Sequence, residues 1–193
     1  MEQGRNALIA QLLKKYFNST VPRLLDVGCG YGMQLSFLPR KWEINYTGID
    51  FSYEAILEAK RKHAVRLKRP KFFNISIEAF TAGRGQYDSI IFNEVLYYVN
   101  LTEVLPRYAS YLATDGYIIT SNYMGFKNKK ENVDLQGEIL KYYRMEDQVS
   151  LTRPADGLTF SISSFRPKPV PSGTGCPLSL HQTIFRTGCL LTA

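Results

Sequence analysis

Hydrophobic and polar positions follow two patterns along the chain, one typical of amphipathic helices and the other of buried strands. Residues 4–17 place apolar side chains at helical spacing, which predicts a helix with one apolar face. Further along, short apolar runs alternate with stretches of helical spacing, which predicts strands separated by helices. The predicted strands cover residues 23–28, 45–50, 71–75, 87–92 and 117–121, and the predicted helices between them cover residues 32–38, 52–67 and 102–112.

The last part of the pattern predicts a hairpin. After a polar, loop-like stretch over residues 124–134 and a predicted helix over 137–145, two strands are expected at 148–153 and 159–165. The residues between these strands, 154–157, form a typical turn sequence. Alternating strands and helices indicate an α/β fold with a parallel sheet. We therefore expect seven mostly parallel strands, helices on both faces and an antiparallel C-terminal hairpin strand.

The amino-acid composition of the chain changes after Arg166. Prolines, glycines and small polar residues crowd the tract over residues 167–175, and the remainder up to residue 193 shows no clear period. We therefore expect one domain over residues 1–166, followed by an irregular and mobile tail over residues 167–193.

A glycine-rich turn follows the first predicted strand. Asp26 ends the apolar run, and Gly28, Gly30 and Gly32 come directly after it. Glycines in such a turn let the backbone pass very close to a ligand. A second acid, Asp50, closes the next predicted strand. Strand, glycine turn, helix, strand and acid together are typical of a nucleoside-binding unit.

The details of this turn favour one nucleoside cofactor. The dinucleotide fingerprint needs a glycine where this chain has Met33. Asp26 would repel a phosphate, but its carboxylate suits a ligand that carries an ammonium group. S-adenosylmethionine has an ammonium group, a sulfonium and no phosphate, and Asp50 can accept hydrogen bonds from both hydroxyls of its ribose. The sequence therefore predicts an S-adenosylmethionine site.

Four segments carry a resemblance to class I S-adenosylmethionine-dependent methyltransferases. They are residues 24–32, 48–52, 87–99 and 112–119, the last with Asp115 in place of a glycine, and the resemblance extends over about residues 20–166. It implies a Rossmann-like fold and a methyl-transfer reaction. The cofactor-binding residues that it implies are Asp26, Gly28, Gly30, Asp50, Phe51, Ile77, Glu78 and Asn93.

Some of these assignments have a structural alternative. Phe51 is expected to pack on adenine, although it also fits a place in the core. Ser76 stands where the family often has an acid for the adenine amino group, so either Glu78 or the backbone at Ile77 is expected to replace it. Glu78 equally fits a solvated acid at a helix start. Asn93 is expected to line the methionine end of the cofactor, and its alternative is a helix cap.

The acceptor side is expected after the fourth and fifth strands, at the carboxyl edge of the sheet. Glu94, Tyr97 and Tyr123 are the candidate catalytic residues there, with a role in positioning the acceptor or, for Glu94, in removing a proton. Tyr97 could instead be a packing residue of the following helix, and for Tyr98 this is the favoured interpretation. His63, in a basic helix, is expected at the surface. We expect no metal, because the acidic motif of catechol-type methyltransferases is absent.

The residues that follow the fourth strand bear on the substrate. The run over residues 93–98 is similar to nodulation-type N-methyltransferases, and it lacks the Asn-Pro-Pro-Tyr motif of adenine methyltransferases. The expected acceptor is a small molecule with an amine or hydroxyl, preferably on a sugar-like compound. Two alternatives stay open, a methyltransferase-fold protein that binds without catalysis and a nucleic-acid methyltransferase.

The composition narrows the classes of partner and cellular location, but it assigns no site residue. The formal net charge of +7 motivates the nucleic-acid alternative, but much of it lies in two basic clusters over residues 60–71 and 127–130, which we expect to be solvated. No aromatic nucleic-acid motif accompanies them. The three cysteines form no CxxC pair, which favours a reducing cytoplasm. Apolar runs are too short to span a bilayer, so no membrane association is expected. The sequence gives no signal for the oligomeric state.

Overall fold

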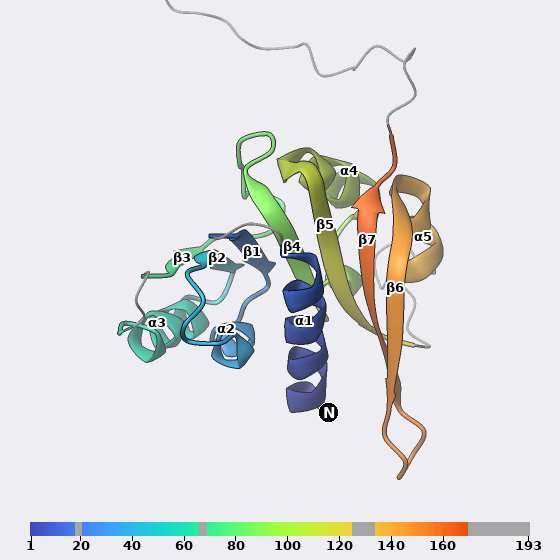
Figure 1. The fold of residues 1–193 in the computed structure, drawn as a ribbon, viewed down its shortest axis with the longest axis horizontal. Coiled ribbons are helices and arrows are strands. Elements are labelled where there is room, and N and C mark those ends of the chain that lie inside the picture. Colours follow the sequence, from blue (N-terminus) through green and yellow to red (C-terminus); the bar gives the residue numbers. More distant parts are fainter. Residues whose placement is uncertain (18–20, 66–68, 125–133, 170–193) are drawn as a thin grey trace, which may run out of the picture.

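The fold is a single twisted sheet with helices on both faces (Figure 1). The computed structural model describes residues 1–17, 21–65, 69–124 and 134–169. Its strands are β1 (Arg23–Val27), β2 (Asn45–Asp50), β3 (Lys71–Asn74), β4 (Tyr87–Asn93), β5 (Leu112–Tyr123), β6 (Tyr143–Thr152) and β7 (Thr159–Pro167). Its helices are α1 (Glu2–Tyr16), α2 (Met33–Phe37), α3 (Tyr53–Lys62), α4 (Leu101–Tyr111) and α5 (Leu135–Tyr142), with a 3₁₀ turn η1 (Leu96–Tyr98).

The sheet has the strand order β3-β2-β1-β4-β5-β7-β6. The first five strands in this order pair in parallel, and β7 pairs antiparallel with both β5 and β6. The predicted Rossmann-like fold, seven-stranded and mostly parallel with an antiparallel C-terminal hairpin strand, is confirmed.

Two apolar clusters hold the helices against the sheet. Side chains alternate between the two faces of a strand, so neighbouring residues of one strand join different clusters. Leu24 and Ile91 face the helices α1, α2 and α3, whereas Leu25 and Ile90 face α4 and α5. In Figure 1, α1 runs alongside β4 and β5, with its first residues at the edge where β5 ends. This placement brings the start of α1 to the carboxyl edge of the sheet.

Several predicted boundaries differ from the structure, two of them through contacts within the sheet and core. The helix predicted up to residue 145 ends at Tyr142, and Tyr143 already begins β6. Tyr143 is fully buried and its hydroxyl donates to the carbonyl of Leu105 at 2.7 Å, so a tertiary contact ends the helix. The strand predicted from residue 117 begins at Leu112, because the turn-like residues 113–116 form a bulge within β5.

The expected tail begins where the description ends. Pro167 is the last residue of β7, and the backbone N–H of Lys168 donates to the carbonyl of Tyr142 at 2.9 Å. Residues 170–193 lie outside the described residues, so the division into a domain and a tail stays a prediction. Most of the loop expected over residues 124–134 also lies outside them.

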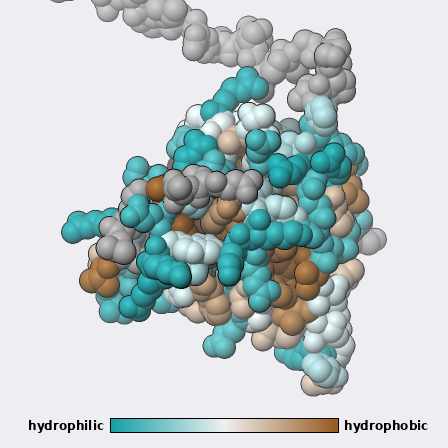
Figure 2. All heavy atoms as spheres, in the orientation of Figure 1, coloured by the Kyte–Doolittle hydropathy of each residue, from teal (hydrophilic) through white to brown (hydrophobic). Residues whose placement is uncertain are grey.

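The surface is mainly hydrophilic in the view of Figure 2, and apolar side chains appear there in separate groups. Among the helices of the described residues, none combines the length and the apolar character needed to cross a bilayer.

Candidate active site

The predicted site residues gather at the edge of the sheet where the parallel strands β1, β2 and β4 end. Ligands bind at this carboxyl edge in doubly wound α/β sheets. A cavity of about 170 Å³ opens there, between the turn after β1 and the first turns of α1. Five of the predicted residues line it, namely Asp26, Gly28, Gly30, Asn93 and Glu94. This cavity is therefore the candidate cofactor site.

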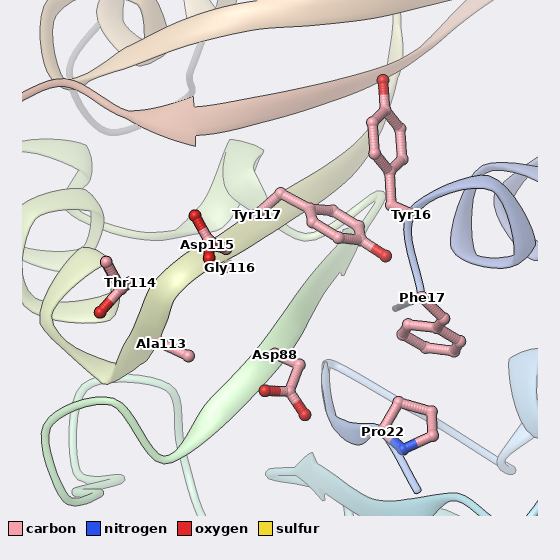
Figure 3. A pocket seen from close by; sticks show the side chains of 9 residues that line it. All are labelled: Tyr16, Phe17, Pro22, Asp88, Ala113, Thr114, Asp115, Gly116 and Tyr117. Carbon is pink, nitrogen blue, oxygen red and sulfur yellow. The ribbon is translucent and has the colours of Figure 1, made fainter. Parts of the chain in front are cut away.

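A larger hollow of about 380 Å³ lies at the opposite, amino edge of the sheet (Figure 3). Its walls include Asp88 of β4, Tyr117 of β5 and the bulge over residues 113–116. The Asp88 carboxylate is already held by Arg23, which donates to it from its backbone N–H at 2.8 Å and from Nη2 at 2.6 Å. The predicted site residues lie away from this hollow, so we place the cofactor in the smaller cavity.

The glycine turn after β1 has a backbone that favours glycine. Gly28, Gly30 and Gly32 have φ values of 70°, 49° and 69°. A Cβ on Gly28 would also lie 3.0 Å from the Val95 side chain. The left-handed backbone is open to glycine at little cost. The turn can therefore pass close to a ligand at the edge of the sheet, as the sequence predicts.

Asp50 is fixed by two backbone groups at the end of β2. Its Oδ2 accepts a hydrogen bond from the N–H of Gly30 at 2.9 Å, and its Oδ1 accepts one from the N–H of Ser52 at 2.9 Å. Each carboxylate oxygen keeps a further lone pair. The Ser52 hydroxyl in turn caps α3 by accepting from the N–H of Ala55. This geometry leaves Asp50 oriented and able to accept hydrogen bonds from a ribose.

Asp26 is a buried acid at the rim of the cavity. It is 1% exposed, and its Oδ2 accepts a short hydrogen bond of 2.5 Å from the Tyr46 hydroxyl. Burial raises the pKa of Asp26 to about 7, the Tyr46 hydrogen bond opposes this rise, and the charge of Asp50 adds to it. A ligand ammonium beside Asp26 would stabilise its ionised form.

We expect cofactor affinity to fall as the pH drops through about 7, because protonation removes the charge of Asp26. Tyr46→Phe removes the hydrogen bond that lowers this pKa, so the midpoint of the fall should move to higher pH. Calorimetric titration with S-adenosylhomocysteine between pH 5.5 and 9 measures both effects. The same midpoint in wild type and Tyr46→Phe would contradict the role of Tyr46.

His63 lies beneath the glycine turn, and its predicted position at the surface is wrong. It is 5% exposed, and its Nε2 donates to the carbonyl of Gly32 at 2.9 Å. Its ring also lies 6.0 Å from that of Phe72. The physical reason is the length of α3: the helix ends at Lys62 rather than residue 67, and His63 follows as its C-cap.

His63→Ala should lower the free energy of unfolding by about 1–3 kcal/mol, because it leaves the buried Gly32 carbonyl without its donor. A looser turn should also weaken S-adenosylhomocysteine binding several-fold. His63→Gln keeps a donor and should restore part of both losses. Chemical denaturation and calorimetry measure the two effects, and an unchanged affinity in His63→Ala would show that this contact does not support the site.

Several polar atoms in and around the cavity are buried without a hydrogen-bond partner among the described residues. They are Arg5 Nε, Asn6 Nδ2, Gln34 Oε1 and Asn93 Oδ1. Such groups are costly to bury unless a ligand or water satisfies them. The two donors suit a carboxylate and the two acceptors suit an ammonium group, which are the two ends of an amino acid. This donor set therefore fits the methionine part of S-adenosylmethionine.

Sequence reasoning missed Arg5 and Asn6, because they precede the glycine turn on a helix that looks merely amphipathic. Asn6 is 1% exposed and shares the buried face of α1 with Ile9 and Leu13. A polar residue on an apolar helix face was the available signal. Asn93 donates to Asn6 Oδ1 at 2.9 Å, and α4 is capped by Asn100, so the alternative of Asn93 as a helix cap is wrong.

The candidate adenine residues lie beside β3. Phe51 is 82% exposed, so it does not belong to the core and its ring is free to cover a ligand. The segment that holds Ile77 and Glu78 is fixed by α4, since Arg107 donates to both of their carbonyls at 2.8 and 2.7 Å. Glu78 is exposed. The adenine roles of these three residues stay predictions.

Comparison with known proteins decides the family. A family model described as a methyltransferase domain matches residues 1–151. The chain belongs to this methyltransferase family. A curated relative, the malonyl-[acyl-carrier protein] O-methyltransferase of Bacillus anthracis, is 30% identical over 146 residues, which are 69% of this chain and 52% of the relative. The methyltransferase thus spans about half the length of that relative.

Solved structures share the fold of this methyltransferase. The N-methyltransferase NodS from Bradyrhizobium japonicum WM9, in complex with S-adenosyl-L-homocysteine, matches with a TM-score of 0.68 at 19% identity, over 87% of each chain. The 1,6-didemethyltoxoflavin-N1-methyltransferase of Burkholderia thailandensis, with its substrate and S-adenosylhomocysteine, matches with a TM-score of 0.67 at 16% identity, over 85% of this chain and 77% of that chain. Both of these structures contain S-adenosylhomocysteine, the product that remains when S-adenosylmethionine has given up its methyl group.

The candidate catalytic residues of the methyltransferase lie together beside the cofactor cavity. Glu94 has a φ of 60°, the only positive value among the described residues that are not glycine. The Tyr97 hydroxyl donates to Glu94 Oε2 at 3.2 Å, and the Ser121 hydroxyl donates to Oε1 at 2.9 Å. The backbone N–H of Tyr123 donates to the Tyr97 hydroxyl. Strained backbone of this kind is concentrated at functional sites.

The two tyrosines of η1 differ from each other. Tyr97 is buried, 5% exposed, and holds Glu94, so it combines packing with a contact to the site. Tyr98 is 54% exposed, so the favoured interpretation of Tyr98 as a packing residue is wrong. The 3₁₀ turn explains the difference, because it points the two neighbouring side chains in different directions.

Proposed function

We propose that this methyltransferase transfers the methyl group of S-adenosylmethionine to an amine or hydroxyl of a small molecule. The observation that carries the proposal is the Glu94 carboxylate, which lines the cofactor cavity on the side of β4 and β5. A carboxylate there attracts a cationic amine, accepts a hydrogen bond from a hydroxyl and repels an anionic acceptor.

In this proposal the protein binds the two ends of the donor separately. Asp26 and Asn93 would hold the ammonium group, Arg5 and Asn6 the carboxylate, and Asp50 the ribose. The sulfonium, when bound, supplies an electrophilic methyl group. The contribution of the chain is to align the acceptor with that methyl group and to exclude water.

Glu94 would also take the proton that the acceptor loses. Burial raises the pKa of Glu94 above its ordinary value, while the hydrogen bonds from Ser121 and Tyr97 and the charge of Arg5 oppose this rise. A carboxylate with a raised pKa is a better proton acceptor near neutral pH. Such a base matters only for an acceptor that is protonated, as a primary amine is.

The same carboxylate weighs against the other acceptors. The Bacillus anthracis relative is named for a malonyl group, and a free carboxylate acceptor would meet the charge of Glu94. For nucleic acid, one of the three basic residues in the last turn of α3 is already paired, since Arg61 contacts Glu58 at 2.6 Å. The second basic cluster lies outside the described residues. Two of the similar structures are N-methyltransferases, which supports a nitrogen acceptor.

The proposal is tested by measuring how fast S-adenosylhomocysteine forms from S-adenosylmethionine in the presence of different acceptors. Primary amines and alcohols should support turnover, while malonyl and other acyl carboxylates and duplex or single-stranded oligonucleotides should not. If only a carboxylate or an oligonucleotide were methylated, the choice of acceptor would be overturned and the assignment of the methyl donor would stand.

A further inference from the structure

The sheet face beneath α5 changes from apolar to polar toward the end of β5. Cross-strand pairs between β5 and β7 show the change: Ile118 pairs with Phe165, then Thr120 with Ser163, and then Asn122 with Ser161. Because side chains two residues apart point to the same face, these pairs form one row. We call Thr120, Asn122, Ser161 and Ser163 the polar row.

Packing does not account for the polar row. Thr120, Ser161 and Ser163 are 1%, 6% and 3% exposed, and the facing helix α5 offers the apolar Leu135 and Ile139. Valine or alanine would fill such positions without the cost of burying hydroxyl groups. The sequence instead continues the apolar pairs of the core with hydroxyl and amide side chains.

The hydrogen bonds of the row are incomplete. The hydroxyls of Ser161 and Ser163 lie 3.0 Å apart, and Gln148 Nε2 donates to the Ser161 hydroxyl at 2.7 Å. Asn122 Oδ1 is buried and has no partner among the described residues. A buried acceptor without a donor points to a group supplied from outside the chain.

A cavity of about 90 Å³ opens in front of the polar row. Of the described residues that line it, Asp134 alone carries a charge, and its carboxylate caps α5 by accepting from the N–H of Gly137 at 2.7 Å. Apart from Asp134, the described groups that line the cavity are neutral. They suit hydroxyl or amide groups of a ligand rather than an ion.

The cavity adjoins the candidate catalytic residues. Tyr123 lines it, and the backbone N–H of Tyr123 donates to the Tyr97 hydroxyl that also contacts Glu94. Ser121, between two members of the row, holds Glu94 from the other face of β5. Asn122, at one end of the row, is thus flanked in the sequence by Ser121 and Tyr123, which contact Glu94 and Tyr97.

We propose that the polar row binds a neutral, polyhydroxylated arm of the methyl acceptor. This inference rests on the proposed function, because it places the reacting amine or hydroxyl at Glu94 and extends the same molecule past Tyr123. The row would then select a polyol over an apolar acceptor of the same size, since each unmatched buried group costs binding free energy.

Two probes of similar size test this selection. Glucosamine presents a primary amine and several hydroxyls, whereas cyclohexylamine presents the amine on an apolar ring. With S-adenosylmethionine as donor, kcat/KM for glucosamine should exceed that for cyclohexylamine at least tenfold. Equal values would overturn the inference and leave the proposed amine acceptor standing.

The variant Thr120→Val/Ser163→Ala removes two hydroxyls of the row with little change of shape. It should raise KM for glucosamine at least tenfold with kcat within twofold, and the affinity for S-adenosylhomocysteine should stay unchanged. Its melting temperature should not fall, because apolar groups replace buried hydroxyls. Ser164→Ala is the matched control, since this serine lies on the other face of β7 and donates to the Tyr16 hydroxyl.

If neither amine is methylated, the proposed function loses support. The role of the polar row is then tested by direct binding. Saturation-transfer NMR of glucosamine with the S-adenosylhomocysteine complex should then show binding to the wild type and to Ser164→Ala and loss of binding to the double variant. Absence of binding to the wild type, or equal binding to the double variant, would overturn the role of the row.

Discussion

Asp50→Ala should weaken S-adenosylhomocysteine binding by about 100-fold or more. Two hydrogen bonds from ribose hydroxyls to a charged acceptor are each worth about 1.5–3 kcal/mol, and both are lost. The change also releases the N–H groups of Gly30 and Ser52, which Asp50 holds at 2.9 Å each, so the glycine turn loses an anchor. Isothermal titration calorimetry measures the affinity directly.

Two further variants separate the role of Asp50 from a general loss of structure. Asp115→Ala removes an exposed acid at the amino edge of the sheet and should bind S-adenosylhomocysteine like the wild type. Asp50→Asn keeps acceptor oxygen but not the charge, so its affinity should be intermediate. An Asp50→Ala protein that is folded and binds with wild-type affinity would refute the ribose assignment.

Glu94→Gln should lower kcat for an amine acceptor by about 10²–10⁴-fold, the usual contribution of a general base. Glutamine keeps the size of the side chain, and its one carbonyl oxygen can still accept a hydrogen bond from Ser121 or Tyr97, but it does not take a proton. The affinity for S-adenosylhomocysteine should change only a few-fold. Steady-state kinetics with glucosamine or cyclohexylamine, together with calorimetry, gives both quantities.

The pH dependence supplies an independent check on Glu94. Burial raises the pKa of Glu94, and the Ser121 hydrogen bond opposes this rise. As the pH is lowered, wild-type kcat should therefore begin to fall at a pH above the ordinary pKa of a glutamate. Ser121→Ala removes one opposing bond and should shift that fall to higher pH. A kcat that is independent of pH and insensitive to Glu94→Gln would leave Glu94 with a positioning role only.

The fold could be predicted because its strands carry unmistakable local signals. The segment from Leu24 to Gly32 combines a buried strand with a glycine turn, and each glycine has the positive φ that its position requires. Strand ends set by distant contacts could not be predicted in the same way. Tyr143 begins β6 because its hydroxyl reaches Leu105 across the core, 38 residues away in the chain.

The part of the site that lies on the strands could be predicted from the sequence, whereas the part supplied by α1 could not. Asp26 and Asp50 stand at the carboxyl ends of two strands that pair in parallel, so their proximity follows from topology. Arg5 and Asn6 reach the same cavity only through the docking of α1, which no local pattern reveals. His63 was misplaced because the end of α3 decides its direction, and basic residues around it resemble a solvated helix face.

The position of α1 links cofactor binding to the conformation of the first helix. Arg5 and Asn6 form part of the cavity wall. In the proposed binding mode, a molecule in which this helix has detached would lose two of the four groups that hold the amino-acid end of the donor. Binding and helix docking are therefore one coupled equilibrium. A cofactor at 100 times its Kd would favour the docked helix by about 2.7 kcal/mol, so the cellular supply of methyl donor would itself determine how often the first helix opens.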